Sequence, residues 1–183
     1  KLPPFSKTEA SLILKKELGE KTFQNIHEFS EPIAAASIAQ VHFAKIKNNG
    51  VEKEVAIKIL RPSIQKIFNE ELDALMLLAY IIENAVKKTK RLKLIEIVYL
   101  LKEITNIEMD LRFEAAAANE LYENTKNDIG FIVPKIYWNF TTQKILTLDR
   151  IEGIPIRETE KLTKSGIDTK KNIQKSNTTF LKT

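Results

Sequence analysis

The hydrophobic period of the chain changes at Pro62, and this change indicates the fold class. Before it, two segments rich in β-branched residues, 38–46 and 51–60, flank Asn48-Asn49-Gly50. A turn tripeptide of this kind between two apolar runs favours a β-hairpin. From Ser63 onward the apolar residues recur every three or four positions, which predicts a helix. The chain must therefore combine a sheet with helices that pack against it, which is an α+β fold.

Further helices and strands are expected on both sides of this region. Ser6 followed by Glu9 has the spacing of a capping box, and Gly19 can end the helix that starts there. The remaining segments have apolar residues at helical or at extended spacing: a long helix over 94–122, and extended pieces at Ile33, over 133–140 and over 145–151. Together they predict the order helix, three strands, two long helices, two strands.

Composition excludes several kinds of function. The chain has no cysteine and only two histidines, which excludes thiolate and multi-histidine metal sites. Its net charge is +5, with basic residues clustered over 87–93 and 161–182. A nucleic-acid surface would interleave aromatic residues, and 87–93 has none, so a solvated helix end is the preferred interpretation there. The longest apolar run, 74–82, is far shorter than the roughly 20 residues of a membrane-spanning helix, so we predict no transmembrane segment.

Two short strings have the chemistry of a phosphate site. Val55-Ala56-Ile57-Lys58 matches the kinase strand whose lysine holds the nucleotide phosphates and pairs with a helix glutamate. Ala34-Ala35-Ala36-Ser37 lies where a kinase has a glycine-rich loop, and its small side chains keep the backbone accessible. Each string alone has a simpler explanation, a solvated strand lysine or an alanine-rich helix in the core.

A third string, 108–119, contains two carboxylates at helical spacing. Asp110 and Glu114 are four residues apart, so in one continuous helix they would share a face and repel each other. This placement is favourable only if cations lie opposite, and Lys58 is the candidate for one of them. An exposed acidic patch is the alternative for either carboxylate.

In this order, PIAAASIAQVH, VAIKILRP and EMDLRFEAAAAN resemble the UbiB family of atypical kinase-like proteins, and ILTLDRIEGIPI resembles its fifth strand and hinge. The resemblance covers about residues 3–156. It implies a protein-kinase-like N-lobe, which is an antiparallel five-stranded sheet with added long helices, and a missing C-lobe. The expected organisation is an N-terminal helical extension over 1–27, the N-lobe through the hinge over 28–156, and the poorly ordered start of a truncated C-lobe over 157–183.

The resemblance also implies a site for ATP or ADP with magnesium. The residues it assigns to this site are Ile33, Ala34, Ala35, Ala36, Ser37, Val41, Lys58, Glu108, Asp110, Glu114, Asp149 and Ile151. The alanine loop would cover the phosphates, and Val41 would lie over the adenine. Lys58 would contact the phosphates and pair with Glu114. Main-chain groups near Asp149 and Ile151 would face the adenine edge.

The sequence departs from the family in two places. The K-x-G-Q segment, whose lysine meets the E-x-D glutamate (here Glu108, with Asp110 as the aspartate), is absent. After Ile156 there is no histidine, Asp168 is the sole aspartate, and no Asp-Phe-Gly occurs. Phosphoryl transfer needs a catalytic-loop aspartate and metal ligands, so we expect no catalytic residue, no metal ligand, weak nucleotide binding and no turnover by this chain alone. Because it begins at Lys1, we also expect a fragment of a longer product.

Two functions from different classes fit these features. The first is the N-lobe fragment of a UbiB-type kinase or ATPase that supports ubiquinone biosynthesis, completed by a separately encoded C-lobe. The second is a non-catalytic module that binds a protein or a lipid. A small-molecule kinase of the aminoglycoside type is disfavoured because AAASIAQVH is not its loop. The resemblance further implies a membrane surface or ubiquinone-biosynthesis proteins as partners, and a cytoplasmic location or a peripheral one on the cytoplasmic face of the inner membrane.

Overall fold

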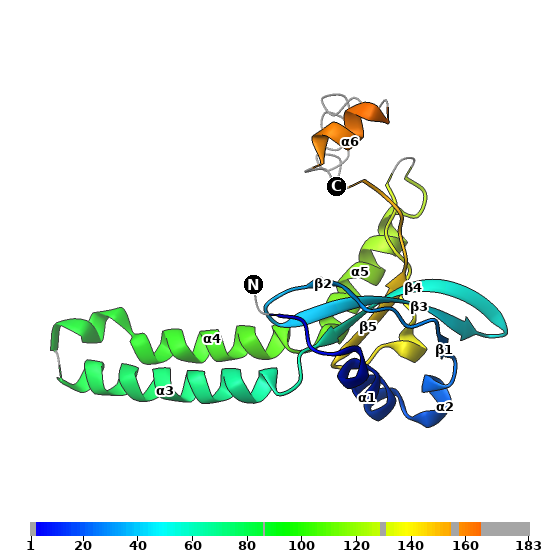
Figure 1. Ribbon diagram of the computed structural model, residues 1–183. Coiled ribbons are helices and arrows are strands. Elements are labelled where there is room, and N and C mark those ends of the chain that lie inside the picture. The colour runs from blue at the N-terminus through cyan, green and yellow to red at the C-terminus, as the bar shows by residue number, and fades with distance from the viewer. Residues whose placement is uncertain (1–2, 86, 129–130, 155–157, 166–183) are drawn as a thin grey trace. The chain divides into compact units, whose positions relative to one another are not determined.

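The β-hairpin expected at Asn49-Gly50 forms the middle of the sheet in the computed structural model (Figure 1). Strand β3 (Ala39–Asn48) pairs antiparallel with β4 (Val51–Leu60) over the whole length of both strands. Asn49 and Gly50 have φ angles of 51° and 82°, and a two-residue hairpin turn requires such left-handed values. The prediction of this hairpin is confirmed.

Three further strands complete an antiparallel five-stranded sheet, as predicted. They are the short strands β1 (Ile26–His27), β2 (Pro32–Ala35) and β5 (Ile145–Asp149). The strand order is β1-β3-β4-β5, and β2 also pairs with β3. The α+β class is therefore confirmed. The structure describes residues 3–85, 87–128, 131–154 and 158–165.

One predicted strand is wrong, and another strand was missed. Residues 133–140 contribute only an isolated bridge between Ile136 and Leu148, followed by the short 3-10 helix η2 (Trp138–Phe140). Pro134 has no N–H to donate to a sheet, and the chain turns away at η2, so pairing stops after one bridge. The fifth strand is β1. It has only two residues, too few to show a hydrophobic period in the sequence.

The N-terminal helix α1 (Lys7–Leu18) begins and ends as expected, with the Ser6 hydroxyl accepting a hydrogen bond from the Glu9 N–H. Gly19, with φ of 77°, separates it from α2 (Glu20–Phe23). After the sheet hairpin, the chain forms α3 (Ile64–Ala85), the 3-10 helix η1 (Lys87–Leu92) and α4 (Leu94–Glu108).

The single long helix expected over 94–122 is wrong, because the chain breaks between α4 and α5 (Leu111–Thr125). Asp110 has an extended backbone and caps α5, where its carboxylate accepts a hydrogen bond from the Arg112 N–H. The Leu111 N–H donates to the Gln143 carbonyl instead of to a helical partner. Aspartate favours such cap positions over helix interiors, so the break has a local cause as well as a tertiary one.

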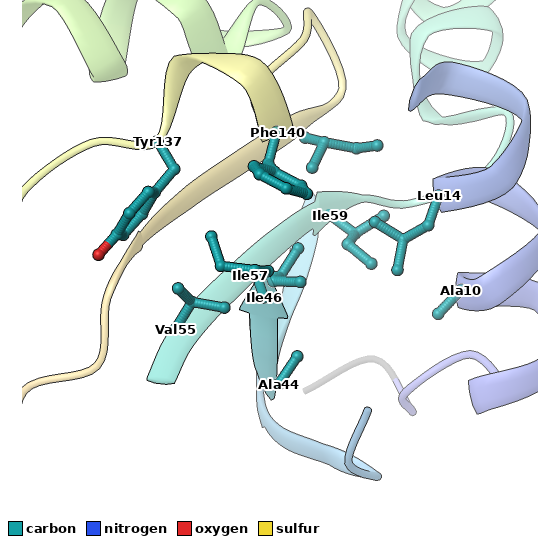
Figure 2. Close-up of a cluster of buried hydrophobic side chains, with 10 residues drawn as sticks. Ala10, Leu14, Ala44, Ile46, Val55, Ile57, Ile59, Tyr137 and Phe140 are labelled. Atoms are coloured by element: carbon teal, nitrogen blue, oxygen red, sulfur yellow. The ribbon is translucent and has the colours of Figure 1, made fainter. Parts of the chain in front are cut away.

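Alternate residues of the central strands face two different hydrophobic clusters. On one face, Ile57 and Ile59 of β4 pack with Leu14 of α1 and with Tyr137 and Phe140, as Figure 2 shows. The other face holds a second cluster that includes Leu60 and Leu146 of the sheet, with Ile64, Leu111 and Ala115 from the helices. Because α1 belongs to the first cluster, the N-terminal helix is part of the core.

The chain divides into two units, Lys1–Arg150 and Ile151–Thr183. The sheet and helices α1 to α5 belong to the first unit. In the second, the structure describes the short helix α6 (Thr159–Lys164). Most of the segment 157–183, for which the sequence predicts the poorly ordered start of a C-lobe, lies outside the described residues.

A buried polar cluster fixes the N-terminal segment to the sheet. The Gln40 side chain exchanges hydrogen bonds with both main-chain groups of Phe5. His42, with no exposed surface, has Nδ1 2.9 Å from the Ser30 carbonyl oxygen and Nε2 2.9 Å from the Gln40 amide nitrogen. The neutral imidazole with its proton on Nδ1 satisfies both contacts. Burial lowers the pKa of His42 below its ordinary value of 6.5.

We therefore expect the protein to lose stability as the pH falls from about 7.5 to about 5, because the unfolded chain takes up a proton that buried His42 resists. His42→Gln removes this titration, so its free energy of unfolding, although lower near neutral pH, should fall less over the same range. Urea unfolding of both proteins at several pH values measures the two slopes. Equal slopes would show that His42 does not cause the loss.

Candidate functional site

A row of side chains crosses the sheet on the face of the second cluster. Ala34, Val41, Lys58 and Leu146 lie directly opposite one another on β2, β3, β4 and β5. Side chains of directly opposed residues point to the same face of a sheet. Val41 and Lys58 are half-buried, while Leu146 is buried. This face is therefore covered at Leu146 and partly open at Lys58.

Helix α5 brings a carboxylate to this row. Glu114, in the first turn of α5, places Oε2 2.6 Å from Lys58 Nζ. This is the pair that the family resemblance implied. The Lys58 side chain is 27% exposed and that of Glu114 is 49% exposed. An ion pair this accessible contributes only about 0–1 kcal/mol to stability. Its main effect is to hold the ammonium group at a fixed place above the sheet.

The alanine segment Ala34–Ser37 is the end of β2 and the turn that follows it, and not a buried helix. The Ala36 N–H donates to the Ala39 carbonyl at 2.8 Å. The Ala36 carbonyl accepts hydrogen bonds from Nε and Nη2 of Arg61, at 3.2 and 3.0 Å. None of the residues 34–37, all of which the structure describes, has a positive φ angle, so the alanine backbone is not strained there. The exposed residues of this segment are Ile33, Ala34, Ala36 and Ser37, and Ala35 is half-buried.

The two acids of the E-x-D motif occupy different environments. Glu108 is the last residue of α4 and is exposed. Asp110 is buried, and its Oδ2 lies 2.6 Å from Nη2 of Arg112. Hydrogen bonds from Arg112 hold the pKa of the Asp110 carboxyl below its ordinary value of 3.8. The prediction that Asp110 shares a helix face with Glu114 is therefore wrong: Asp110 caps the helix, and Arg112 is its partner.

Substitutions at Asp110 separate its cap from its charge. Asp110→Ala should lower the free energy of unfolding by about 1–2 kcal/mol through loss of the cap. Asp110→Asn should lower the free energy of unfolding by less, because asparagine also caps helices. The loss that remains is that of the charge interaction with Arg112. A depressed folded-state pKa stabilises the protein above the unfolded pKa and ceases to do so as the pH falls. The difference between wild type and Asp110→Asn should therefore shrink below about pH 4; urea unfolding that gives a constant difference would contradict this.

The groups of Asp149 already have partners within the first unit. Its N–H donates to the Lys135 carbonyl at 2.9 Å, so this donor is not available to an adenine ring. Its carboxylate accepts a hydrogen bond from the Tyr137 hydroxyl at 2.6 Å, and burial together with this bond raises the pKa of Tyr137 well above 10.0. Asp149 thus ties β5 to the segment before η2. Ile151 is exposed and belongs to the second unit.

Two apolar residues beside Lys58 were missed by the sequence analysis. Ala56 and Leu148 lie directly opposite each other and are both half-buried. Each is two residues from a member of the first row, Ala56 from Lys58 and Leu148 from Leu146. With Phe43, which is opposite Ala56, they form a second row on the same face. Because side chains alternate along a strand, the sequence indicates that Ala56 shares a face with Lys58. The position of Leu148 depends on the register between β4 and β5. The site therefore has an apolar side next to its cation.

A cavity of about 380 Å³ lies away from this row. It is lined by α1, by the link from β4 to α3 and by Lys144. Two of its cations already have acidic neighbours, since Lys144 contacts Glu17 at 2.9 Å and Lys66 approaches Glu70 at 3.7 Å. The cross-strand row, which combines a cation, an exposed loop and an apolar surface, is the better candidate for a nucleotide.

A strand lysine paired with a helix glutamate, as Lys58 is with Glu114, is the arrangement of a kinase-like N-lobe. The model of the ABC1 atypical kinase-like domain matches residues 1–183, and the chain belongs to that family. A protein of Marinobacter nauticus described as "Probable protein kinase UbiB" is 36% identical over 169 residues, which is 92% of this chain. Proteins with the same description from Azotobacter vinelandii and Cellvibrio japonicus are 33% and 37% identical over 93% and 92% of it. The chain spans 30–31% of the length of these relatives.

The described residues contain no group of three or more histidine or acidic side chains that could hold a metal ion. Nor does any helix in the described part of the chain have the length and apolar character needed to cross a bilayer.

Proposed function

We propose that this chain forms the nucleotide-binding lobe of a UbiB-type atypical kinase or ATPase. The observation that carries the proposal is the Lys58–Glu114 pair, at 2.6 Å, on the partly open face of the sheet. A lysine held by a carboxylate in this way presents a fixed positive charge to the α- and β-phosphates of a nucleotide. Membership of the ABC1 atypical kinase-like family supports the same use of the pair.

The residues around Lys58 fit the remaining parts of ATP. The half-buried side chains of Val41, Ala56 and Leu148 offer an apolar surface for the adenine ring. The segment Ala34–Ser37, at the end of β2 and in the turn after it, has side chains small enough for its peptide groups to approach phosphate oxygens. Adenine over the apolar row and phosphates over Lys58 and the loop would occupy one continuous face.

The described residues offer magnesium no cluster of three acidic or histidine side chains. When bound, Mg²⁺ neutralises charge on the phosphates during phosphoryl transfer. We propose that the described residues bind the nucleotide and orient it, and that turnover requires residues supplied by a C-lobe. We propose a separately encoded polypeptide as the source of that lobe. A role in ubiquinone biosynthesis follows as a further proposal from the resemblance to the UbiB family.

Titration of the chain with a fluorescent ATP analogue, with and without Mg²⁺, tests the nucleotide proposal. We expect saturable binding that unlabelled ATP displaces, and no measurable phosphate release by the chain alone. Phosphate release that appears only after addition of a C-terminal polypeptide from a UbiB relative would support the division between two lobes. If ATP does not displace the analogue, the nucleotide proposal fails and a non-catalytic binding module becomes the better interpretation.

A further inference from the structure

The cavity beside α1 has the volume of a small-molecule site. It holds about 380 Å³, and ligand pockets in proteins hold roughly 300–1,000 Å³. Its lining comes from α1, from the link between β4 and α3, and from Lys144 just before β5. The fold fixes these parts, because Ile13 of α1 packs against the first cluster and the Leu60 N–H donates to the Lys144 carbonyl at 3.0 Å. The cavity therefore has walls that are already in place.

Positive charge predominates among the side chains that line this cavity. Lys16, Lys66 and Lys144 line it together with Glu17, which is the one acidic residue among the described residues of the lining. Lys144 forms a 2.9 Å ion pair with Glu17, and Lys66 lies 3.7 Å from Glu70 on the exposed side of α3. Lys16 is exposed and forms no ion pair within the described part of the chain. The single carboxylate leaves the cavity with a net positive charge.

The remaining lining combines a hydroxyl group with aliphatic side chains. Leu60 and Ile64 are buried, and Ile13 is partly buried. Ser63 is exposed, and its hydroxyl makes no hydrogen bond to any residue that the structure describes. Its φ angle of 59° is one that residues other than glycine rarely adopt, and such backbone strain is found most often at functional sites. Cations, a hydroxyl donor and aliphatic groups together suit a ligand with one anionic and one apolar part.

We propose that this cavity binds a small organic anion, whose phosphate or carboxylate group contacts Lys16 and Lys144 and whose apolar part contacts Leu60 and Ile64. A lysine ammonium binds such a group as a point charge. The aliphatic side chains would make an organic anion bind more tightly than an inorganic one, by removing its apolar surface from water. The inference is independent of the proposed nucleotide site, because Lys58 does not line the cavity.

Nuclear magnetic resonance titration of the 183-residue chain with phenyl phosphate, and separately with inorganic phosphate, tests the proposal. We expect the amide resonances of Lys16, Ser63 and Lys144 to shift along one saturation curve, while that of Lys58 stays in place. Phenyl phosphate should bind about tenfold more tightly than inorganic phosphate. Equal affinities for the two compounds would overturn the proposal. Shifts that centre on Lys58 would also overturn it, because the anion would then occupy the nucleotide site.

The double substitution Lys16→Gln and Lys144→Gln should weaken phenyl phosphate binding about tenfold. Lys15→Gln with Lys45→Gln is the matched control, because it removes the same charge from residues that do not line the cavity. Lys15 is the exposed neighbour of Lys16 on α1, and Lys45, like Lys144, is paired with a glutamate. The control should change the affinity less than about twofold, with both spectra those of a folded protein. Equal losses would show attraction to net charge alone and overturn the proposal. Equal ATP affinities in the two double variants would separate this result from failure of the nucleotide site.

Discussion

Lys58→Ala is expected to weaken ATP binding by about 10- to 100-fold, because a hydrogen bond to a charged group contributes roughly 1.5–3 kcal/mol. The Lys58 ammonium is the cation of the cross-strand row, and it forms a 2.6 Å ion pair with the Glu114 carboxylate. Glu114→Gln should weaken binding less, since the lysine keeps its charge and loses only its orientation. Titration with the fluorescent ATP analogue gives both affinities.

Lys45→Ala provides a matched control for this experiment. Lys45 is on the neighbouring strand β3, its side chain is 28% exposed against 27% for Lys58, and it forms a 2.7 Å ion pair with Glu28. Its substitution removes the same charge and the same kind of contact at another place. ATP affinity should therefore remain within about twofold of wild type. A comparable loss in Lys45→Ala and Lys58→Ala would mean that net charge, and not the proposed site, determines binding.

Neither lysine substitution should unfold the protein. Exposed ion pairs of this kind contribute about 0–1 kcal/mol, so the free energies of unfolding of the two variants should stay close to that of wild type. The difference between them should appear only in nucleotide affinity. This result would separate the function of Lys58 from its small part in stability.

The elements predicted correctly from the sequence are those set by local signals. Asn49 and Gly50 supply the backbone conformation of the β3–β4 turn, and Ser6 supplies the cap of α1. The contact of Lys58 with Glu114 joins residues 56 positions apart, and the motif order of the family indicated it where periodicity could not. Local pattern and family motif together predicted the central contact of the candidate site.

The errors lie where tertiary contacts select between local alternatives. Residues 108–113 have an apolar period that continues a helix, but Asp110 caps a new one and the Leu111 N–H donates to the distant Gln143 carbonyl. The segment 133–140 has strand-like composition, yet it forms one bridge and then the turn η2. In both places the partner that decides the conformation is remote in sequence. The same reason explains why Leu148 was missed beside Lys58.

The alternation of side chains along β4 allows the proposed binding role of Lys58 to be tested separately from the packing of its neighbour Ile57. Ile57 has no exposed surface and packs in the cluster of Figure 2 with Ile59, Tyr137 and Phe140, whereas Lys58 points to the opposite face. Any effect of Ile57 on nucleotide affinity would have to pass through the strand itself. The two faces can therefore be tested by substituting neighbours.

Ile57→Ala should lower the free energy of unfolding by about 2–5 kcal/mol, because it removes apolar contacts and leaves a cavity in the core. Val51→Ala, on the same strand but at a residue that is 54% exposed, should change it by less than about 0.5 kcal/mol. Urea unfolding measures both values, and a loss below about 1 kcal/mol for Ile57→Ala would contradict its place in the core. At temperatures where Ile57→Ala remains folded, its ATP affinity should match wild type. Ile57→Ala would then lower stability without changing ATP affinity, and Lys58→Ala would lower ATP affinity without changing stability, as expected for residues on opposite faces of one strand.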